Sequence, residues 1–317
     1  MSQVVEPAGF EKTHPLPDGI YAMLVTPFYS NEDINFLALQ KEVVWCNDLG
    51  AQGIVVCPSI GEFACLSKDE RWACFEGCFD TAKRVGRSGF KTIATIAATH
   101  TIEMLEHARR AKNIGYDAGQ LTAPYYWIPD EEEVLDYFKA ACDTDLPIVV
   151  YHNPRLSKFK MSRKFLGKLA RLEGVIAIKE VETDRHVELE PLFKEVKGTG
   201  VKIFTTFRAF LDGAMLYSSG GFINVFALPA CLALMELIKQ GDLWGASDLQ
   251  TMINEVFPRG GEGNLKHIGT TKMAASVVTG IDMGSPRSPY KLPDPKFEAR
   301  LREEWPKLEK LIGNVLR

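Results

Sequence analysis

The chain has 317 residues, of which 46% are hydrophobic and 25% are charged, and its formal net charge is −4. This composition is ordinary for a globular protein, and the slight acidic excess gives no electrostatic reason to expect a nucleic acid or an anionic membrane as partner. No apolar stretch approaches the ~20 residues that a membrane-spanning helix needs, and residues 1–18 lack the features of a signal peptide. The sequence therefore predicts a cytoplasmic protein whose seven cysteines stay reduced.

Strand and helix patterns alternate regularly from residue 19 onward. Short runs rich in β-branched residues predict strands at 19–27, 53–59, 90–97, 118–124, 147–151, 175–179, 201–207 and 220–225. Apolar residues at helical spacing predict helices at 35–49, directly after 67–70, and at 101–113, 131–142, 165–172, 184–196 and 209–217. Eight strands that alternate with helices predict an α/β fold of the (β/α)8 TIM-barrel type. A doubly wound sheet is the alternative, but no switch point is evident.

The pattern changes near residue 228. Strand signals stop there, and three helical patterns follow at about 229–256, 264–279 and 294–316. The chain is therefore expected to divide into an N-terminal arm, a barrel and a C-terminal helical region, at 1–18, 19–228 and 229–317.

Residues 147–182 contain a strand, a helix and a strand of the length typical of a βαβ unit, so the two strands are expected to lie parallel and side by side. The side-chain period of two places Val175, Ala177 and Lys179 on one face of the second strand, and Tyr151 ends the first. Parallel α/β folds bind substrates at the carboxyl ends of their strands. Tyr151 and Lys179 are therefore expected to share a site.

The strand that leads to Lys179 is apolar. Burial disfavours the ammonium form, so the pKa of a buried lysine falls toward neutrality, and a neutral lysine attacks carbonyl groups to form Schiff bases. The alternative is a lysine whose stem lies along the barrel rim with its charged head in water.

Three other predicted strand ends carry distinctive sequences. Ser-Ile-Gly-Glu at 59–62 follows the second strand; a Gly-containing turn there directs backbone N–H groups toward an anion, although plain turn chemistry is the alternative. Pro-Tyr-Tyr-Trp at 124–127 is an aromatic cluster typical of packing or of an oligomer interface. Thr-Pro-Phe at 26–28 ends the first strand.

In their order and spacing these segments resemble the dihydrodipicolinate synthase / N-acetylneuraminate lyase superfamily of pyruvate-handling class I aldolases. The resemblance extends from about residue 19 to residue 289. It rests on TPF at 26–28, Gly-Glu at 61–62, PYY at 124–126, the strand that ends at Tyr151, IKE at 178–180 and PRSP at 286–289.

The resemblance implies roles for individual residues. Lys179 matches the Schiff-base lysine, and Tyr151 matches the tyrosine that relays protons beside it. Ser59 matches the first hydroxyl of the family's Thr-Thr-Gly-Glu turn, and with the N–H of Ile60 it would hold the pyruvyl carboxylate. Tyr126 matches a tyrosine that in many members completes a proton relay, sometimes across a subunit interface.

Further substrate contacts are expected from Gly61, Asn153, Arg208 and Val225, each at or just beyond a strand end. A surface ion pair is the alternative role for Arg208. No metal or organic cofactor is expected, because the protonated imine itself acts as the electron sink. His152 alternates away from Tyr151, which favours packing over catalysis.

The departures from the family pattern bear on the substrate. Ile60 replaces the second hydroxyl of the turn, and Leu156 stands where dihydrodipicolinate synthases have an Arg that helps bind the aldehyde's carboxylate. Arg155 comes one residue early, which changes where its side chain points; this argues against lysine biosynthesis. YHNPRLSKFK at 151–160 looks more like the hydratase-aldolases that cleave benzylidenepyruvates, whereas IKEVE at 178–182 and INVFALP at 223–229 look closer to the synthases.

The sequence therefore predicts a Schiff-base aldolase or lyase that acts on pyruvate or a substituted 2-oxo acid, with a hydratase-aldolase that releases pyruvate and an aldehyde as its specific form. The alternatives are a 2-keto-3-deoxy sugar-acid dehydratase or aldolase, a dihydrodipicolinate synthase, and a non-catalytic paralogue that senses 2-oxo acids. The expected partners are the 2-oxo acid, the aldehyde and further copies of the chain in a dimer or tetramer, with Tyr125 and Trp127 at the contact.

Overall fold

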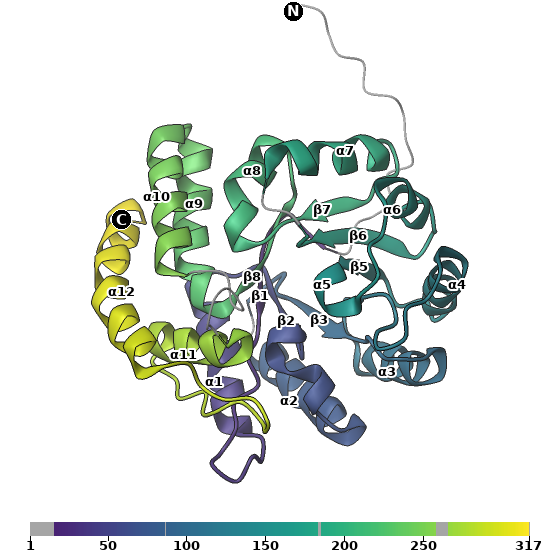
Figure 1. Ribbon diagram of the computed structural model, residues 1–317, viewed down its shortest axis with the longest axis horizontal. Coiled ribbons are helices and arrows are strands. Elements are labelled where there is room, and N and C mark those ends of the chain that lie inside the picture. Colours follow the sequence, from purple (N-terminus) through teal and green to yellow (C-terminus); the bar gives the residue numbers. More distant parts are fainter. Residues whose placement is uncertain (1–15, 86, 183–184, 258–265, 317) are drawn as a thin grey trace, which may run out of the picture.

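The computed structural model describes residues 16–85, 87–182, 185–257 and 266–316. Its eight parallel strands form one sheet in the order β7-β6-β5-β4-β3-β2-β1-β8, and helices surround this sheet (Figure 1). The strands are β1 Gly19–Met23, β2 Gly53–Val56, β3 Lys91–Thr95, β4 Ala118–Leu121, β5 Ile148–His152, β6 Val175–Glu180, β7 Lys202–Phe204 and β8 Gly220–Asn224.

The sheet closes on itself between β7 and β8. Thr205, directly after β7, forms a parallel bridge with Gly221, and the N–H of Phe222 donates to the carbonyl of Thr205 at 2.9 Å. Closure pairs the two strands that would otherwise be sheet edges. The predicted (β/α)8 barrel is therefore confirmed.

The helices alternate with these strands and then continue alone. They are α1 Phe36–Leu49, α2 Lys68–Val85, α3 Thr101–Ile114, α4 Glu131–Cys142, α5 Pro154–Ser157, α6 Arg163–Leu169, α7 His186–Val196, α8 Phe210–Met215, α9 Leu228–Gln240, α10 Leu243–Val256, α11 His267–Thr279 and α12 Pro295–Val315. Four 3-10 turns in the described residues are η1 Ser59–Gly61, η2 Phe63–Cys65, η3 Phe207–Ala209 and η4 Val225–Ala227. None of the described helices is both long and apolar enough to cross a membrane.

Several strands end earlier than predicted, and two helical segments differ from the sequence-based expectation. The single helix expected at 229–256 is two helices, because Gly241 adopts a left-handed φ of 78° and Asp242 caps the next helix by accepting from the N–H of Gly245. The short helix α5, which follows β5, was not expected. The N-terminal arm up to residue 15 and the predicted helical residues 184, 264 and 265 lie outside the described residues.

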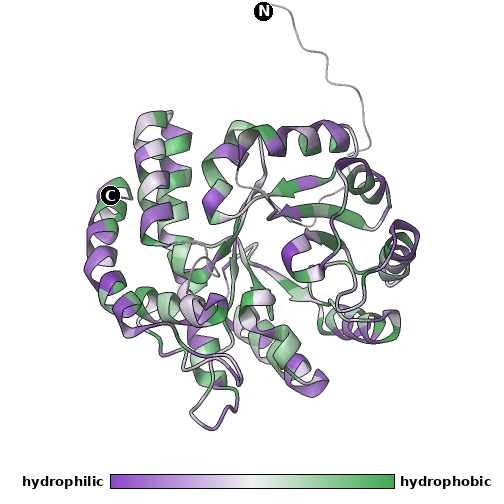
Figure 2. Ribbon diagram, viewed as in Figure 1, coloured by the Kyte–Doolittle hydropathy of each residue, from purple (hydrophilic) through white to green (hydrophobic). Residues whose placement is uncertain are grey.

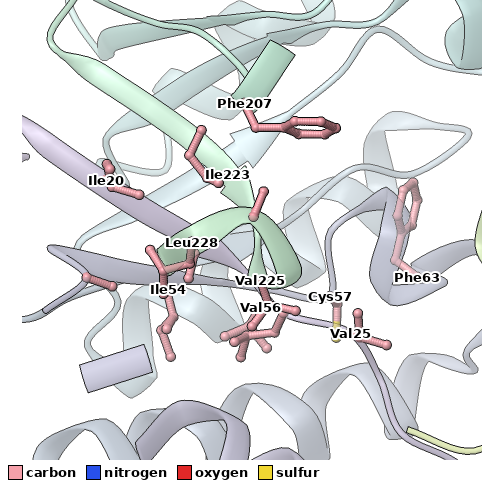
Figure 3. Packing of buried hydrophobic residues seen from close by; sticks show 14 of the residues in the cluster. Ile20, Val25, Ile54, Val56, Cys57, Phe63, Phe207, Ile223, Val225 and Leu228 are labelled. Carbon is pink, nitrogen blue, oxygen red and sulfur yellow. The ribbon is translucent and has the colours of Figure 1, made fainter. Parts of the chain in front are cut away.

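Apolar side chains form two cores. One fills the barrel with lumen-facing residues such as Tyr21, Val55 and Phe222. The other lies between the sheet and the helices, and Figure 3 shows part of it around Ile54 and Ile223. Figure 2 shows the same division, with mainly hydrophobic strands at the centre and helices that alternate between hydrophobic and hydrophilic residues.

The C-terminal helices pack together on one side of the barrel. Helix α12 contacts α9, α10 and α11, and these four helices lie at the left of Figure 1. Helix α9 also contacts β1 and β8, and α11 contacts η4 directly after β8. The last quarter of the chain therefore reaches the end of the barrel at which the strands terminate.

Candidate active site

Lys179 lies inside the barrel beside Tyr151. Strands β5 and β6 pair in a register that sets Tyr151 opposite Lys179, so the predicted pairing of these strands is confirmed. Lys179 is only 1% exposed, and its Nζ lies 4.0 Å from the centre of the Tyr151 ring and 2.8 Å from Sδ of Met23. A lysine with its head in bulk water is thus ruled out.

An aromatic floor lies in the lumen close to Lys179. Tyr21, Phe204 and Phe222 contact one another with ring centres 4.9 to 5.5 Å apart, and Nζ of Lys179 lies 5.8 Å from the centre of the Phe222 ring. Burial among these groups lowers the pKa of Lys179 to about 7. Desolvation disfavours the ammonium form, so a large fraction of this amine is neutral near pH 7.

Tyr151 is held by two polar neighbours. Nδ2 of Asn153 donates to its phenol oxygen at 2.6 Å, and Oγ of Ser59 lies 3.5 Å from the same oxygen. Burial raises the pKa of Tyr151, and the hydrogen bonds only partly oppose that shift. The phenol therefore keeps its proton at neutral pH and is positioned to pass it on.

The turn Ser59–Gly61 forms one wall of the site. β2 ends at Val56, earlier than predicted, because Cys57 adopts a left-handed φ of 50° that a strand does not accommodate. A Cβ on Gly61 would lie 3.0 Å from the carbonyl oxygen of Leu24, so the chain approaches too closely there for a side chain. Oγ1 of Thr26 donates to the carbonyl of Gly61 at 2.6 Å and ties the turn to the end of β1.

Behind this turn lies a buried group of charges that sequence reasoning missed. Nζ of Lys272, on α11, lies 3.1 Å from a carboxylate oxygen of Glu62, and both side chains are fully buried. The backbone N–H of Arg287 donates to the other oxygen of Glu62 at 3.0 Å, and the Arg287 guanidinium pairs with Glu70. No local signal marks Lys272, because its partners are distant in the sequence.

One cavity contains most of the predicted site. Its volume is about 160 Å³, and its lining includes Ser59, Ile60, Tyr151, Asn153, Lys179 and Arg208. Arg155 also lines it. Arg155 comes one residue before the position at which the synthases have an Arg. On a strand such a shift would turn the side chain to the opposite face, but on a helix such as α5 it rotates the side chain by only about 100°. Leu156 lines a second cavity of about 600 Å³ that meets the first at Ser59, Tyr151, Asn153 and His267.

Three residues named from the sequence lie outside this lining. Val225 is fully buried in the outer core (Figure 3), and its neighbours Asn224 and Phe226 line the cavity instead. Gly61 supports the turn without lining the cavity. Tyr126 is 79% exposed, and its ring contacts that of Trp127 edge-on.

The side chain of His152 is held by contacts within the protein and does not line the cavity of Lys179. Its Nδ1 lies 3.0 Å from the Glu180 carboxylate, and its Nε2 accepts from the N–H of Met161 at 3.2 Å. Burial acts to raise the pKa of Glu180, but His152 and Arg163 outweigh it and the pKa is lowered. His152, Glu180 and Glu182 have the spacing of metal ligands, yet Arg163 and Lys160 already pair with the two carboxylates, so these three residues do not indicate a metal site.

A buried amine of near-neutral pKa beside a protonated phenol, at the end of a barrel, is suited to form a Schiff base with a carbonyl substrate. The model of the dihydrodipicolinate synthetase family matches residues 16–297. The chain is 31% identical over 261 residues to a 4-hydroxy-tetrahydrodipicolinate synthase of Rhodopseudomonas palustris, covering 78% of this chain and 84% of the relative. It is 29% identical to an N-acetylneuraminate lyase of Escherichia coli, covering 75% and 80%.

Solved structures have the same fold. A putative dihydrodipicolinate synthetase from Pseudomonas aeruginosa superposes with a TM-score of 0.82 at 22% identity, covering 92% of this chain and 99% of that one. A catalytic-lysine mutant of the Ruminococcus gnavus sialic acid aldolase superposes with a TM-score of 0.81 at 20% identity, covering 94% and 96%. The chain belongs to the dihydrodipicolinate synthetase family, and it is a pyruvate-dependent lyase of the class I aldolase type.

Proposed function

We propose that this enzyme is a hydratase-aldolase that cleaves an aromatic 2-oxo acid of the benzylidenepyruvate type into pyruvate and an aldehyde, with Lys179 as the Schiff-base residue. The observation that carries the proposal is the cavity around Lys179, in which a buried amine with a pKa of about 7 faces the ring of Tyr151.

The chemistry begins when neutral Lys179 attacks the keto carbon and water leaves, which gives a protonated imine. Water then adds across the substrate's double bond and places a hydroxyl on the carbon that becomes the aldehyde. Loss of the hydroxyl proton and cleavage of the carbon–carbon bond send the electron pair into the imine and give an enamine. Protonation of the enamine carbon and hydrolysis release pyruvate and restore Lys179.

The remaining site residues move protons and orient the substrate. Tyr151, supported by Ser59 and Asn153, exchanges protons with the substrate oxygens. The Ser59 hydroxyl and the N–H of Ile60 hold the pyruvyl carboxylate, which fixes the keto carbon in reach of Lys179. Tyr126 is proposed to add to this relay only in an oligomer, since its side chain is exposed in the single chain.

The cavity walls favour an aromatic aldehyde over a sugar chain. Phe207, Phe226, Phe257 and Phe297 all line the cavity and are all less than 10% exposed. These four walls suit an aryl ring, and they offer no hydrogen bonds to the hydroxyls of a 2-keto-3-deoxy sugar acid. Leu156, at the position of the synthases' Arg, supplies no charge and lines the second cavity; Arg155, one residue earlier, is the cation that lines the cavity of Lys179.

Borohydride trapping tests the role of Lys179. Reduction in the presence of pyruvate should attach the three-carbon unit to Lys179, as mass mapping of peptides would show, and Lys179→Met should abolish the adduct. Lys164→Met, which changes an exposed lysine on α6, should leave the adduct intact. An adduct on another lysine, such as the buried Lys272, would contradict the proposal.

A substrate panel tests the reaction. Benzylidenepyruvate should be cleaved with a kcat/KM at least tenfold above that of 2-keto-3-deoxygluconate, and pyruvate with aspartate semialdehyde should give no cyclic product. A reversal of this order would favour the sugar-acid enzyme. Ligand-induced thermal stabilisation without turnover of any 2-oxo acid would favour the sensor.

We also propose that the chain forms a homo-oligomer through the segment after β4. Trp127 and Ile128 are 80% and 73% exposed beside Tyr126, which is a costly arrangement for an isolated molecule. Light scattering should report a dimer or tetramer, and Trp127→Glu should shift it toward the monomer.

A further inference from the structure

A short strip of polar side chains lies on the inner face of β3 and β4, in a lumen whose core is mainly apolar. We propose, on the basis of the function proposed above, that one of these side chains, Thr122, holds the water molecule that adds to the substrate's double bond. The water approaches Tyr151 from the second cavity, while the substrate occupies the cavity of Lys179.

The polar strip consists of Thr95 at the end of β3, Gln120 on β4 and Thr122 directly after β4. Ala118 belongs to the core inside the barrel, so the side-chain period of two directs Gln120 and Thr122 inward as well. Nε2 of Gln120 donates to Oγ1 of Thr95 at 3.3 Å, across the register that pairs these two residues. All three side chains are buried.

Two oxygen atoms of this strip are buried without a hydrogen-bond partner among the residues that the structure describes. They are Oγ1 of Thr122, which is 6% exposed, and Oε1 of Gln120, which has no exposed surface. A buried polar atom without a partner is destabilising, and a valine at position 122 would have the same shape without that cost. A small ligand that hydrogen-bonds to Thr122 therefore accounts for the hydroxyl.

Thr122 lies beside the phenol of the site. Strands β4 and β5 pair through Leu121 and Val150, and Thr122 and Tyr151 are the next residues on these two strands. Both of them line the second cavity. Because neighbouring strands lie about 4.8 Å apart, one water molecule can contact the hydroxyls of both side chains.

The two cavities give the substrate and the water separate places. Aromatic walls line the cavity of Lys179, which receives the substrate, and Thr122 does not line that cavity. The second cavity, of about 600 Å³, contains Thr122 in its lining and meets the first at Ser59 and Tyr151, among others. A water site needs only about 10–15 Å³ of such volume. Water can therefore reach Tyr151 without crossing the space that the aryl ring fills.

Other polar side chains of the second cavity are less suited to hold this water. Glu62 is paired with Lys272, and Oγ of Ser157 donates to a backbone carbonyl at 3.0 Å. His267 lines both cavities, and its Nδ1 also has no partner among the described residues. Thr122 is preferred over His267 because strand pairing places it next to the phenol that exchanges protons, and His267 lies on α11 without such a pairing.

The hydration step balances within the site. Thr122 accepts one hydrogen bond from the water and Tyr151 accepts the other, which leaves a lone pair of the water oxygen free to attack. That oxygen bonds to the aryl-bearing carbon, and the electrons of the double bond move toward the protonated imine and give an enamine. The water loses one proton to Tyr151 as the phenol releases its own. One proton returns to the carbon beside the imine carbon, which restores the protonated imine.

The test supplies the substrate before and after hydration. Benzylidenepyruvate must gain water before cleavage, whereas 4-hydroxy-2-oxo-4-phenylbutanoate already carries the hydroxyl. In Thr122→Val, kcat/KM for benzylidenepyruvate should fall about ten- to hundredfold, as expected for the loss of one hydrogen bond to the reacting water, and kcat/KM for the hydroxy acid should stay nearly unchanged. Thr122→Ser should restore most of the lost rate.

The control is Thr205→Val. It removes another buried hydroxyl without a partner among the described residues, at a position that lines neither of the two cavities, and both rates should remain at the wild-type level. Borohydride trapping of pyruvate on Lys179 should be equally fast in every variant, which shows that the fold and the amine are intact.

The reverse reaction gives a second readout. With benzaldehyde and pyruvate, the wild-type enzyme should form the hydroxy acid and then dehydrate it to benzylidenepyruvate. In Thr122→Val the hydroxy acid should accumulate at early times, because the same water must leave in this direction. Chromatography of quenched samples measures the ratio of the two products.

The possible outcomes separate the water site from the proposed function. Equal losses with both substrates in Thr122→Val, or no loss with either, would overturn the role of Thr122 and leave the hydratase-aldolase intact. A selective loss of hydration in His267→Phe but not in Thr122→Val would move the water to α11 and would also overturn it. A wild-type enzyme that cleaves the hydroxy acid but not benzylidenepyruvate, or that gives no borohydride adduct on Lys179, would instead show that the proposed function itself is wrong.

Discussion

Lys179 owes its chemistry to its surroundings rather than to a charged neighbour. Burial alone accounts for the fall of its pKa to about 7, since the groups closest to it are the thioether of Met23 and the rings of Tyr151 and Phe222. These groups solvate an ammonium ion less well than water does. A lysine at the same strand end, but in water, would be protonated at neutral pH.

This environment predicts a pH profile for imine formation. Only the neutral amine attacks, so the rate with pyruvate should rise about tenfold per pH unit below 7 and level off above it. Rapid-quench borohydride trapping between pH 5.5 and 9.5 would measure the rate. If the rate instead kept rising beyond pH 9, the amine would have the pKa of an ordinary exposed lysine and the argument from burial would fail.

Among the elements, the turn Ser59–Gly61 is held by a buried ion pair between Glu62, directly after the turn, and Lys272 on α11. We call this ion pair the brace. Burial raises the pKa of Glu62 and lowers that of Lys272 to about 8, so for both partners desolvation outweighs the attraction between them. Such a pair contributes little net stability, but the loss of one member leaves a buried charge without compensation. The brace therefore serves to fix the turn in place.

Substitution of this brace gives a prediction for stability and binding. Lys272→Met should reduce the free energy of unfolding by about 3–5 kcal/mol and should raise the KM for pyruvate, because the turn is no longer held. The double variant Glu62→Gln/Lys272→Met should recover part of both effects. Urea unfolding and steady-state kinetics provide the measurements, with the exposed Lys310→Met as control; equal effects in the single and double variants would refute the brace.

At the scale of the whole molecule, the C-terminal helices and the barrel form one structure. Phe297 on α12 lines the cavity of Lys179, and Leu301, Trp305, Leu308 and Ile312 on the same helix are buried. The extension predicted after residue 228 thus closes the site as well as covering the barrel.

Because the C-terminal helices pack against the barrel, we expect a cavity in α12 to lower the free energy of unfolding of the whole molecule. Leu308→Ala removes a side chain with no exposed surface and should cost about 2–5 kcal/mol in a single cooperative unfolding transition. Leu316→Ala, at a position 47% exposed, should change stability by less than about 0.5 kcal/mol. Separate transitions for the barrel and the helices, measured by calorimetry, would show that they are independent.

The fold could be predicted from the sequence because each strand and helix has its own local pattern. The end of β2 could not be predicted. The residue that adopts a left-handed φ there is Cys57, whereas Gly is the residue that usually marks such a conformation. The break at Gly241 was visible in the sequence but was overridden by the continuous apolar pattern on both sides. Lys272 carries no motif, and no reading of neighbouring residues would have selected it.

The sequence by itself determined the eight-strand alternation, the family, and the pairing of Tyr151 with Lys179, because a period of two and a parallel register follow from local residue order. Only the tertiary structure decided that Lys179 is buried away from water, that Arg155 lines the same cavity and that α11 supplies Lys272 to hold the turn. Desolvation and ion pairing depend on groups that are far apart in the chain, and folding is what brings them together.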